Sequence, residues 1–276
     1  MGKKLIFLDI DGTLCQPGSN IPPASALEAV QKARASGNLV FLCTGRNLGM
    51  LSPLLKYGFD GVVASSGGYV TCGDTVIYDC PMNPDQQKKA MDVLLRNGVF
   101  RTVECRERSY TDEGFKEFLR EKAQKESNSE LLRWREQIEK ELGILPMAAY
   151  HGDPVYKMVL MCERREQLEE PVAVLSDEFA IVIQDDESHG YINGEMALRC
   201  FNKGMGIRRV CEYLHVPIEN TYGYGDSMND WEMIDTVGHS VVMENGSAAL
   251  KERADEICSS VSEDGLYKSF QRNHLL

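Results

Sequence analysis

The stretch Lys4-Leu5-Ile6-Phe7-Leu8-Asp9-Ile10-Asp11-Gly12-Thr13-Leu14 decides the fold. Its apolar run, residues 5–8, has the length and composition of a strand buried in a parallel sheet. Two carboxylates end this run, and Gly12 favours a sharp turn that brings Asp11 up beside Asp9. Buried carboxylates repel each other and lose hydration, so a cation or hydrogen-bond donors must compensate. The pattern therefore favours chemistry in which one carboxylate attacks, the other moves a proton, and a divalent cation neutralises both.

Two simpler interpretations apply to this stretch, a plain strand-end turn and a fragment of a calcium-binding loop. An EF-hand loop that starts at Asp9 needs a further oxygen ligand at its fifth position and Glu at its twelfth. Those positions hold Thr13 and Asn20. Calcium binding of this type is disfavoured, whereas the plain turn stays open on this stretch alone.

Composition restricts the class of protein. The chain has 276 residues and a net charge of −12, so it has room for more than one domain and would repel nucleic acid or an anionic membrane. No apolar stretch reaches transmembrane length, and no cleavable leader precedes the first strand. Nine cysteines without a C-x-x-C pair indicate reduced core residues of a cytoplasmic protein, and the five histidines show no zinc spacing.

Alternating strands and helices follow the first strand and predict a parallel α/β sheet with right-handed crossovers. The predicted helices cover residues 24–36 and 48–56, and the predicted strands cover 38–43 and 61–64. Gly37 lies where a helix C-cap belongs. Ligands of such sheets gather at the carboxyl ends of the strands, where Asp9, Asp11, Thr44 and Ser66 are expected.

After a hairpin at 69–78, the texture of the chain changes and charged residues become more frequent. We interpret residues 83–190 as an α+β domain inserted into the α/β core, with linkers at 79–84 and 186–194. Its predicted helices cover 84–97, 112–126, 129–142 and 164–175, the last interrupted by Pro171. Its predicted strands cover 99–103, 156–161 and 179–184.

The α/β pattern resumes in the last part of the chain. We expect helices at 202–214, 230–237 and 247–254, strands at 221–225 and 240–243, and a final helix after residue 262. The predicted architecture is a Rossmann-like parallel sheet core made of residues 1–82 and 191–276, with residues 83–190 inserted as a cap.

With these elements placed, the chain closely resembles the haloacid dehalogenase-like (HAD) hydrolases, specifically the Cof-type phosphatases with an inserted C2-type cap. Four separated motifs match in the family's order. They are Asp9-Ile10-Asp11-Gly12-Thr13 for D-x-D-G-T, Thr44 for the strand-end Thr or Ser, Lys203 before a Gly, and Gly225-Asp226-Ser227-Met228-Asn229-Asp230 for G-D-x-x-N-D. The match covers the whole core, and the cap has a fitting position and length.

The resemblance implies hydrolysis of a small phosphomonoester, such as a sugar phosphate. Asp9 would attack phosphorus and form an aspartyl-phosphate, and Asp11 would serve as general acid and base. Mg²⁺ would be held by the Asp9 carboxylate, the Asp11 backbone carbonyl and Asp226. Lys203 and Thr44 would hold the phosphoryl oxygens.

The same resemblance gives further residues a place near the phosphate. Asn229 and Asp230 would not bind the metal themselves, but would hold Asp226 and the phosphate in position. The remaining candidates for phosphate or substrate binding are Gly12, Thr13, Gly45, Arg46 and Ser66. Ser66 departs from the family, which usually carries Asn before Gly at this strand end, and a hydroxyl or backbone N–H would have to replace that contact.

Each of these residues also has an ordinary structural interpretation. Thr44 is of a type that caps helices, Lys203 is of a type that lies in solvent at a helix start, and Asp230 is an acid in a first helical turn. Asp226 with Ser227 has the composition of another cap. Arg46 either touches the substrate or pairs with an acid, and the sequence favours neither. Only the joint placement of these residues favours the catalytic interpretation.

Other functions compete with phosphatase activity. A sugar phosphomutase of the same fold would need a bisphosphate activator, and a regulator that only binds phosphorylated metabolites would need neither Asp9 nor Asp11 as reacting groups. Carbon–halogen hydrolysis is disfavoured by Asp11, and P-type ATPase chemistry by Asp11 and the lack of membrane spans. The substrate and the oligomeric state do not follow from the sequence. The polar cap candidates are Tyr150, His151, Lys157 and Glu195.

Overall fold

The computed structural model describes residues 2–115, 117–118, 144–184 and 191–276. The chain forms two compact units. The first contains residues 2–46, Leu51–Asp79 and Asn202–Leu276, and the second contains Asn47–Met50 and the described part of Cys80–Phe201. Each unit has its own sheet.

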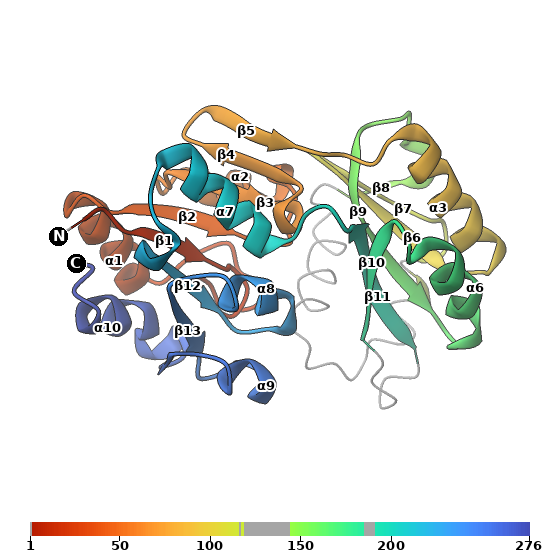
Figure 1. Ribbon diagram of the computed structural model, residues 1–276. Coiled ribbons are helices and arrows are strands. Elements are labelled where there is room, and N and C mark those ends of the chain that lie inside the picture. Colours follow the sequence, from red (N-terminus) through yellow and green to blue (C-terminus); the bar gives the residue numbers. More distant parts are fainter. Residues whose placement is uncertain (1, 116, 119–143, 185–190) are drawn as a thin grey trace. The chain divides into compact units, whose positions relative to one another are not determined.

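The sheet of the first unit has eight strands in the order β14-β13-β12-β1-β2-β3-β4-β5. The strands from β14 to β3 pair in parallel, whereas β3, β4 and β5 pair antiparallel. The bounds are β1 Leu5–Leu8, β2 Leu39–Cys43, β3 Gly61–Ala64, β4 Tyr69–Cys72, β5 Thr75–Asp79, β12 Thr221–Gly225, β13 His239–Met243 and β14 Glu256–Cys258. The predicted α/β fold with a parallel core is confirmed, and β1 lies inside the sheet with β12 on one side and β2 on the other (Figure 1).

Helices connect these strands. Their bounds are α1 Ala24–Ala35, α2 Leu48–Leu55, α7 Lys203–Leu214, α8 Trp231–Ile234, α9 Ala248–Lys251 and α10 Gly265–Arg272. Gly37, two residues after α1, has a φ of 89°, which only glycine adopts readily. At the start of α7 the Asn202 side chain accepts a hydrogen bond from the Met205 amide at 2.7 Å, which is an N-cap.

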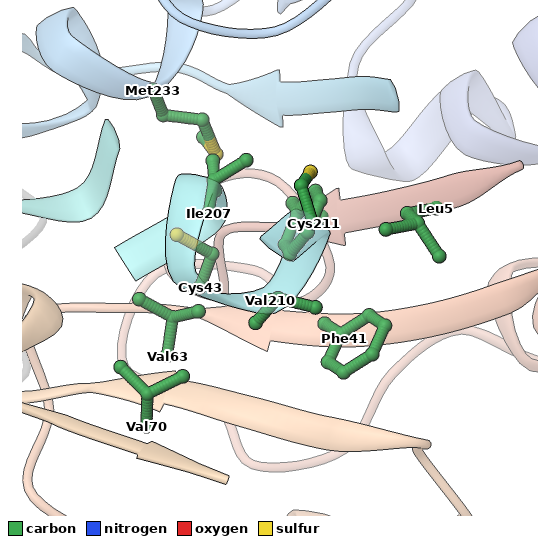
Figure 2. Close-up of a cluster of buried hydrophobic side chains, with 10 residues drawn as sticks. Leu5, Phe41, Cys43, Val63, Val70, Ile207, Val210, Cys211 and Met233 are labelled. Atoms are coloured by element: carbon green, nitrogen blue, oxygen red, sulfur yellow. The ribbon is translucent and has the colours of Figure 1, made fainter. Parts of the chain in front are cut away.

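The core of the first unit lies between the sheet and α7. Leu5 and Phe7 of β1 point to this face, where they join Phe41 and, from α7, Ile207 and Val210 (Figure 2). Each fully buried side chain of this size contributes about 1.5–3 kcal/mol. On the opposite face Phe270 of α10 packs against Tyr224 of β12. The sheet is therefore covered on both faces, as the apolar composition of β1 predicts.

The second unit is built on a six-stranded sheet in the order β10-β11-β9-β6-β7-β8. The bounds are β6 Phe100–Cys105, β7 Ser109–Thr111, β8 Ile144–Pro146, β9 Val155–Cys162, β10 Phe179–Gln184 and β11 Ile192–Leu198. The α-helices in the described part of this unit are α3 Pro84–Arg96 and α6 Glu166–Leu175. At the start of α3, Asn83 and Gln86 form a reciprocal capping box.

Two predictions for this unit are wrong. The helix over 164–175 is not interrupted by Pro171, because α6 runs through it and buries Leu168, Pro171 and Leu175 on one face. Packing of this face outweighs the hydrogen bond that proline cannot make. Residues 186–194 were also expected to form a linker, whereas β11 begins at Ile192 and pairs with β9 and β10. Most of the helices predicted at 112–126 and 129–142 lies outside the described residues.

The division of the chain at residues 83 and 191 stays a prediction. The compact first unit ends at Asp79 and resumes at Asn202, so β11 belongs to the second unit. Within the described ranges, no helix is long and apolar enough to cross a bilayer.

Candidate active site

The candidate site lies at the carboxyl ends of neighbouring parallel strands of the first unit. Asp9 follows β1, Thr44 follows β2 and Asp226 follows β12. All three side chains are buried. Because β1 pairs with β2 on one side and β12 on the other, three segments far apart in the sequence deliver their polar side chains to one edge of the sheet.

Lys203 is the cation of this site. It is the first residue of α7, and only 1% of its surface is exposed. Its Nζ donates to Asp9 Oδ1 at 2.8 Å, to Asp230 Oδ1 at 2.5 Å and to Asn229 Oδ1 at 3.3 Å. The interpretation of Lys203 as a solvent-exposed helix-start residue is therefore wrong, because its ammonium group lies among buried acids.

Asp230 has both carboxylate oxygens engaged. Oδ1 accepts from Lys203, and Oδ2 accepts from the backbone amides of Asp226 at 3.0 Å and Ser227 at 3.1 Å. These contacts hold the turn that carries Asp226. Gly225 allows this packing, because a Cβ there would lie 2.7 Å from the Asp230 carboxylate.

Asp226 is held by groups from two other segments. Its Oδ1 accepts from the Thr13 hydroxyl at 3.1 Å, and its Oδ2 accepts from Asn245 Nδ2 at 3.4 Å. Gly12 lies directly against it with a φ of 86°, and a Cβ at Gly12 would be 2.3 Å from Asp226 Oδ2. The glycine of the first motif is therefore needed both for its backbone conformation and for the room that Asp226 takes.

The electrostatics of the site show an excess of negative charge. Ligand oxygens of Asp9, Asp226 and Asp230 lie within 4.8 Å of one another, and Lys203 is their cationic partner. Burial, and then the charge of Asp230, raises the pKa of Asp9 to about 7 even though Lys203 opposes the shift. Burial, and then Asp9 and Asp230, raises the pKa of Asp226 to about 9. Burial alone would lower the pKa of Lys203, but Asp230 and Asp9 outweigh it and raise that pKa.

This donor set fits a divalent cation. Two of the three carboxylates, Asp9 and Asp226, have raised pKa values because burial removes water from them and neighbouring carboxylates add negative charge, and a bound cation would offset both effects. Asp230 is already occupied by Lys203 and two amides. Asp9 and Asp226 are therefore the residues that could hold a hard cation through carboxylate oxygens.

Asp11 faces a different partner. Its carboxylate accepts two hydrogen bonds from the Arg46 guanidinium, from Nη2 at 2.7 Å and from Nε at 3.0 Å. It also accepts from the Gly18 amide at 3.3 Å. Of the two alternatives for Arg46, pairing with an acid is present in the structure. The Asp11 carboxylate is therefore paired with Arg46, and its backbone carbonyl is the atom that was expected to bind the metal.

Thr44 and the predicted serine lie on adjoining loops. The Thr44 hydroxyl accepts from the Arg46 amide at 3.2 Å, a local contact of the kind that caps make, and its own hydrogen still has to be donated. Gly45, which lies between Thr44 and Arg46 in the sequence, is buried. Ser66 has a φ of 55° and its amide donates to the Thr44 carbonyl at 3.0 Å. Its neighbour Ser65 has a buried hydroxyl without a hydrogen-bond partner among the described residues.

Sequence reasoning missed three polar residues of this site. Asn245 donates to Asp226 and, at 3.0 Å, to the Gly12 carbonyl. Asn20 accepts from Arg46 Nη1 at 2.5 Å, and Ser65 is described above. A signal existed for Asn245, because it follows β13 at the same edge of the sheet as Asp226. Asn20 lies in the loop before α1, and no spacing rule connects it to Arg46.

Comparison with known proteins identifies the class that this fold and site define. The family model of the haloacid dehalogenase-like hydrolases matches residues 6–270, and the chain belongs to this family. It is a phosphatase of the Cof type, since relatives that match nearly its whole length are phosphatases.

Three of these similar proteins illustrate the range. The 5-amino-6-(5-phospho-D-ribitylamino)uracil phosphatase YwtE of Bacillus subtilis is 25% identical over 282 residues, and the match covers 95% of each chain. The pyridoxal phosphate phosphatase YbhA of Escherichia coli is 23% identical over 295 residues and 100% of both chains. The structure of the subclass IIB sugar phosphatase BT4131 is 22% identical with a TM-score of 0.76, covering 99% of this chain and 100% of that one, and it shows the same fold.

Proposed function

We propose that this phosphatase hydrolyses a small phosphomonoester in a Mg²⁺-dependent reaction through an aspartyl-phosphate on Asp9. One observation supports this most directly, namely the buried contact of Asp9 with Lys203 beside Asp226. Asp9 is only 5% exposed, and a buried carboxylate held by an ammonium group presents one oriented oxygen to a phosphoryl group. A protein that only bound phosphate would be expected to place cations there and no nucleophile.

Lys203 would serve the substrate as well as Asp9. Its ammonium group contacts Asp9 and Asp230, and the pull of these acids keeps it protonated. A protonated amine at this place stabilises the negative charge of phosphoryl oxygens in the transition state. Thr44, whose hydroxyl can donate while it accepts from the Arg46 amide, would contribute a second donor.

Asp11 is the proposed general acid and base. Asp9 and Asp11 lie on either side of Ile10, and the turn at Gly12 follows Asp11 directly. The Arg46 fork fixes the orientation of the Asp11 carboxylate. In the first half of the reaction Asp11 would protonate the leaving alcohol, and in the second half it would take a proton from the attacking water.

Mg²⁺ is the proposed cofactor, with the Asp9 carboxylate, the Asp11 backbone carbonyl and Asp226 as its ligands. A bound divalent cation neutralises carboxylate charge and the charge of phosphate oxygens. Thr13 and Asn245 would keep the Asp226 carboxylate in place, and Asp230 would hold the turn behind it. The raised pKa values of Asp9 and Asp226, caused by burial and by neighbouring carboxylates, support this proposal, because a bound cation would favour their charged forms.

The substrate class is proposed as a sugar phosphate or a similar metabolite. The names of the relatives above indicate a phosphorylated ribitylaminouracil, pyridoxal phosphate and, for the sugar phosphatase, a phosphorylated sugar as substrates of those proteins. All of them are small phosphomonoesters. The net charge of −12 agrees with a small substrate met by local cations and argues against a nucleic-acid partner. A cytoplasmic location belongs to the same proposal and is supported by the nine cysteines, which form no disulfide in the part of the chain that the structure describes.

The test is a trapping experiment. The full chain is mixed with Mg²⁺ and p-nitrophenyl phosphate, quenched, and treated with borohydride, which reduces an acyl phosphate to the alcohol. Mass spectrometry of the peptide that contains position 9 should then show homoserine in place of aspartate. The Asp9→Asn variant should lose turnover and trapping, whereas Asp235→Asn, at a surface ion pair with Arg253, should keep both. Wild-type turnover by Asp9→Asn would rule out the proposed nucleophile.

A further inference from the structure

Two cysteines come together where the long segment of the second unit begins and ends. Cys80 directly follows β5, and Cys200 lies two residues before Asn202, where the first unit resumes. They are 120 positions apart in the sequence, yet their Sγ atoms are 3.6 Å apart. Cys80 is half-buried and Cys200 is exposed, so small molecules in solution can reach this pair.

Neighbouring contacts within the second unit hold both cysteines in place. The Met82 amide, two residues after Cys80, donates to the Val155 carbonyl of β9 at 2.7 Å. Arg199, next to Cys200, makes two such contacts. Its backbone amide donates to the Glu178 carbonyl at 3.1 Å, and its side-chain Nε donates to the Ser176 carbonyl at 2.6 Å. The closeness of the two thiols is therefore a property of this unit itself.

The other seven cysteines differ from this pair. Cys15, Cys43, Cys105, Cys162, Cys211 and Cys258 are buried, and Cys72 is half-buried. Burial raises the pKa of Cys211 to about 11 and those of Cys15, Cys105 and Cys258 to about 12. Because the thiolate is the form that reacts, these cysteines are protected from oxidation. Cys80 and Cys200 combine exposure with a thiol neighbour, which the formation of a disulfide requires.

We propose that Cys80 and Cys200 form a reversible dithiol–disulfide site that is oxidised by small-molecule disulfides such as oxidised glutathione. One thiol loses its proton and attacks the small disulfide, which gives a mixed disulfide and one small thiol. The second protein thiol then loses its proton and attacks the protein sulfur of the mixed disulfide. This step forms the Cys80–Cys200 bond and releases the second small thiol, so the protein loses two electrons and two protons and the small disulfide gains them.

The bond would close a loop that contains nearly all of the second unit. The sulfurs have to approach from 3.6 Å to about 2.0 Å, which requires the side chains to rotate. Once formed, the bond ties together the two chain connections that bound this segment. The bond is expected to restrict movement of these two connections relative to each other, and we infer that oxidation slows phosphatase turnover. This last step rests on the phosphatase activity, whereas the thiol chemistry does not.

The experiment oxidises the native full chain in glutathione buffers of increasing oxidised fraction. Free thiols are counted after rapid alkylation, and the linked peptides are mapped by mass spectrometry. We expect a loss of two thiols out of nine, a linked pair of peptides that contain Cys80 and Cys200, and full recovery with dithiothreitol. The turnover of p-nitrophenyl phosphate is measured in the same samples, and it should fall as the bond forms and recover with it.

Two variants provide matched controls. Cys200→Ser should form no internal bond and should carry a glutathione adduct at Cys80. Its turnover should not fall on oxidation, so dithiothreitol should have no loss to restore. Cys72→Ser removes another half-buried cysteine and should behave as the wild type. Retention of all nine thiols in the wild type, or a bond that links other cysteines, would overturn the proposed site. A mapped Cys80–Cys200 bond with unchanged turnover would overturn the proposed effect on activity.

Discussion

The Arg46 guanidinium makes a bidentate contact with the Asp11 carboxylate, in which Nη2 donates to Oδ1 at 2.7 Å and Nε donates to Oδ2 at 3.0 Å. The Arg46 side chain is 1% exposed and that of Asp11 is 11% exposed. The third nitrogen, Nη1, donates to Asn20. Such a fork fixes the plane of the carboxylate as well as its position, which a single lysine amine cannot do. The proposed acid is thereby oriented before any substrate arrives.

Arg46→Lys tests whether this orientation serves proton transfer. The variant keeps the charge and loses the fork. We expect kcat for an alkyl phosphate, which needs a proton on its leaving group, to fall by about 10²-fold. The fall should be much smaller for p-nitrophenyl phosphate, whose leaving group needs little protonation. Asp11→Asn should show the same contrast between the two substrates.

Arg34→Lys is the matched control for Arg46→Lys. Arg34 makes the same two-pronged contact with Asp60, at 2.9 Å for both nitrogens, on the surface of the same unit. The turnover of the Arg34→Lys variant should equal that of the wild type with both substrates. Equal losses for the alkyl and the nitrophenyl ester in Arg46→Lys would contradict a role of Arg46 in orienting an acid.

Metal binding can be measured without turnover. Mg²⁺ should raise the midpoint of thermal unfolding relative to EDTA, because a ligand that binds only the folded state stabilises it by mass action. Asp226→Asn should remove this shift, since it removes one of the two available carboxylates. Asp255→Asn, at an acid held by Ser240 in another part of the unit, should retain it. EDTA should also abolish turnover, and metal-free activity would refute the proposed cofactor.

Gly12→Ala tests the contact between the first motif and Asp226. The new Cβ would lie 2.3 Å from Asp226 Oδ2, and the backbone is left-handed with a φ of 86°. Gly37→Ala separates the two effects, because Gly37 has a φ of 89° and no atom within 4 Å of a Cβ. Both variants should lose about 1–2 kcal/mol of unfolding free energy from backbone strain. Only Gly12→Ala should also lose turnover and the Mg²⁺ shift; retention of both would show that Asp226 can move aside.

Lys203→Met should be strongly destabilising. It leaves two buried carboxylates, Asp9 and Asp230, without the ammonium group, at a cost of about 3–5 kcal/mol. Lys32→Met removes an exposed pair with Glu28, which is worth about 0–1 kcal/mol. Urea unfolding in EDTA measures both. A loss for Lys203→Met as small as that for Lys32→Met would mean that the buried acids do not depend on this lysine.

The pH dependence of one acid away from the site can also be predicted. The Ser240 amide, followed by the Ser240 hydroxyl, lowers the pKa of Asp255, and burial opposes this shift. A lowered pKa in the folded state adds stability that is fully present above the unfolded value and is lost as the pH falls through the folded value. Asp255→Asn should therefore be less stable than the wild type near pH 7. In urea titrations the difference should shrink as the pH falls below the unfolded aspartate value of about 3.9 and vanish below the folded value.

Strand-end residues were predictable from the sequence, and residues held by loops were not. Asp9 and Asp226 follow short apolar strands, and the parallel sheet brings such ends to one edge. That Lys203 is buried between two acids depends on how α7 starts at Asn202, which no spacing reveals. Asn20 and Asn245 reach the site through loops whose path depends on tertiary packing. Strand β11 was missed because the residues before it are polar and Gly194 interrupts its apolar pattern.

The saturation of Asp230 limits how tightly the protein can hold an ion. With Lys203 and two amides on its oxygens, Asp230 leaves only Asp9 and Asp226 as carboxylate ligands. Magnesium is commonly bound by six oxygen ligands, of which one or two are carboxylates and the others are water or substrate phosphate oxygens. Because Asp9 and Asp226 would be its carboxylate ligands, we expect a bound ion to be lost on dialysis of the resting enzyme and to be retained in the presence of a phosphate-bearing ligand. Ion and substrate would then strengthen each other's binding by the same factor.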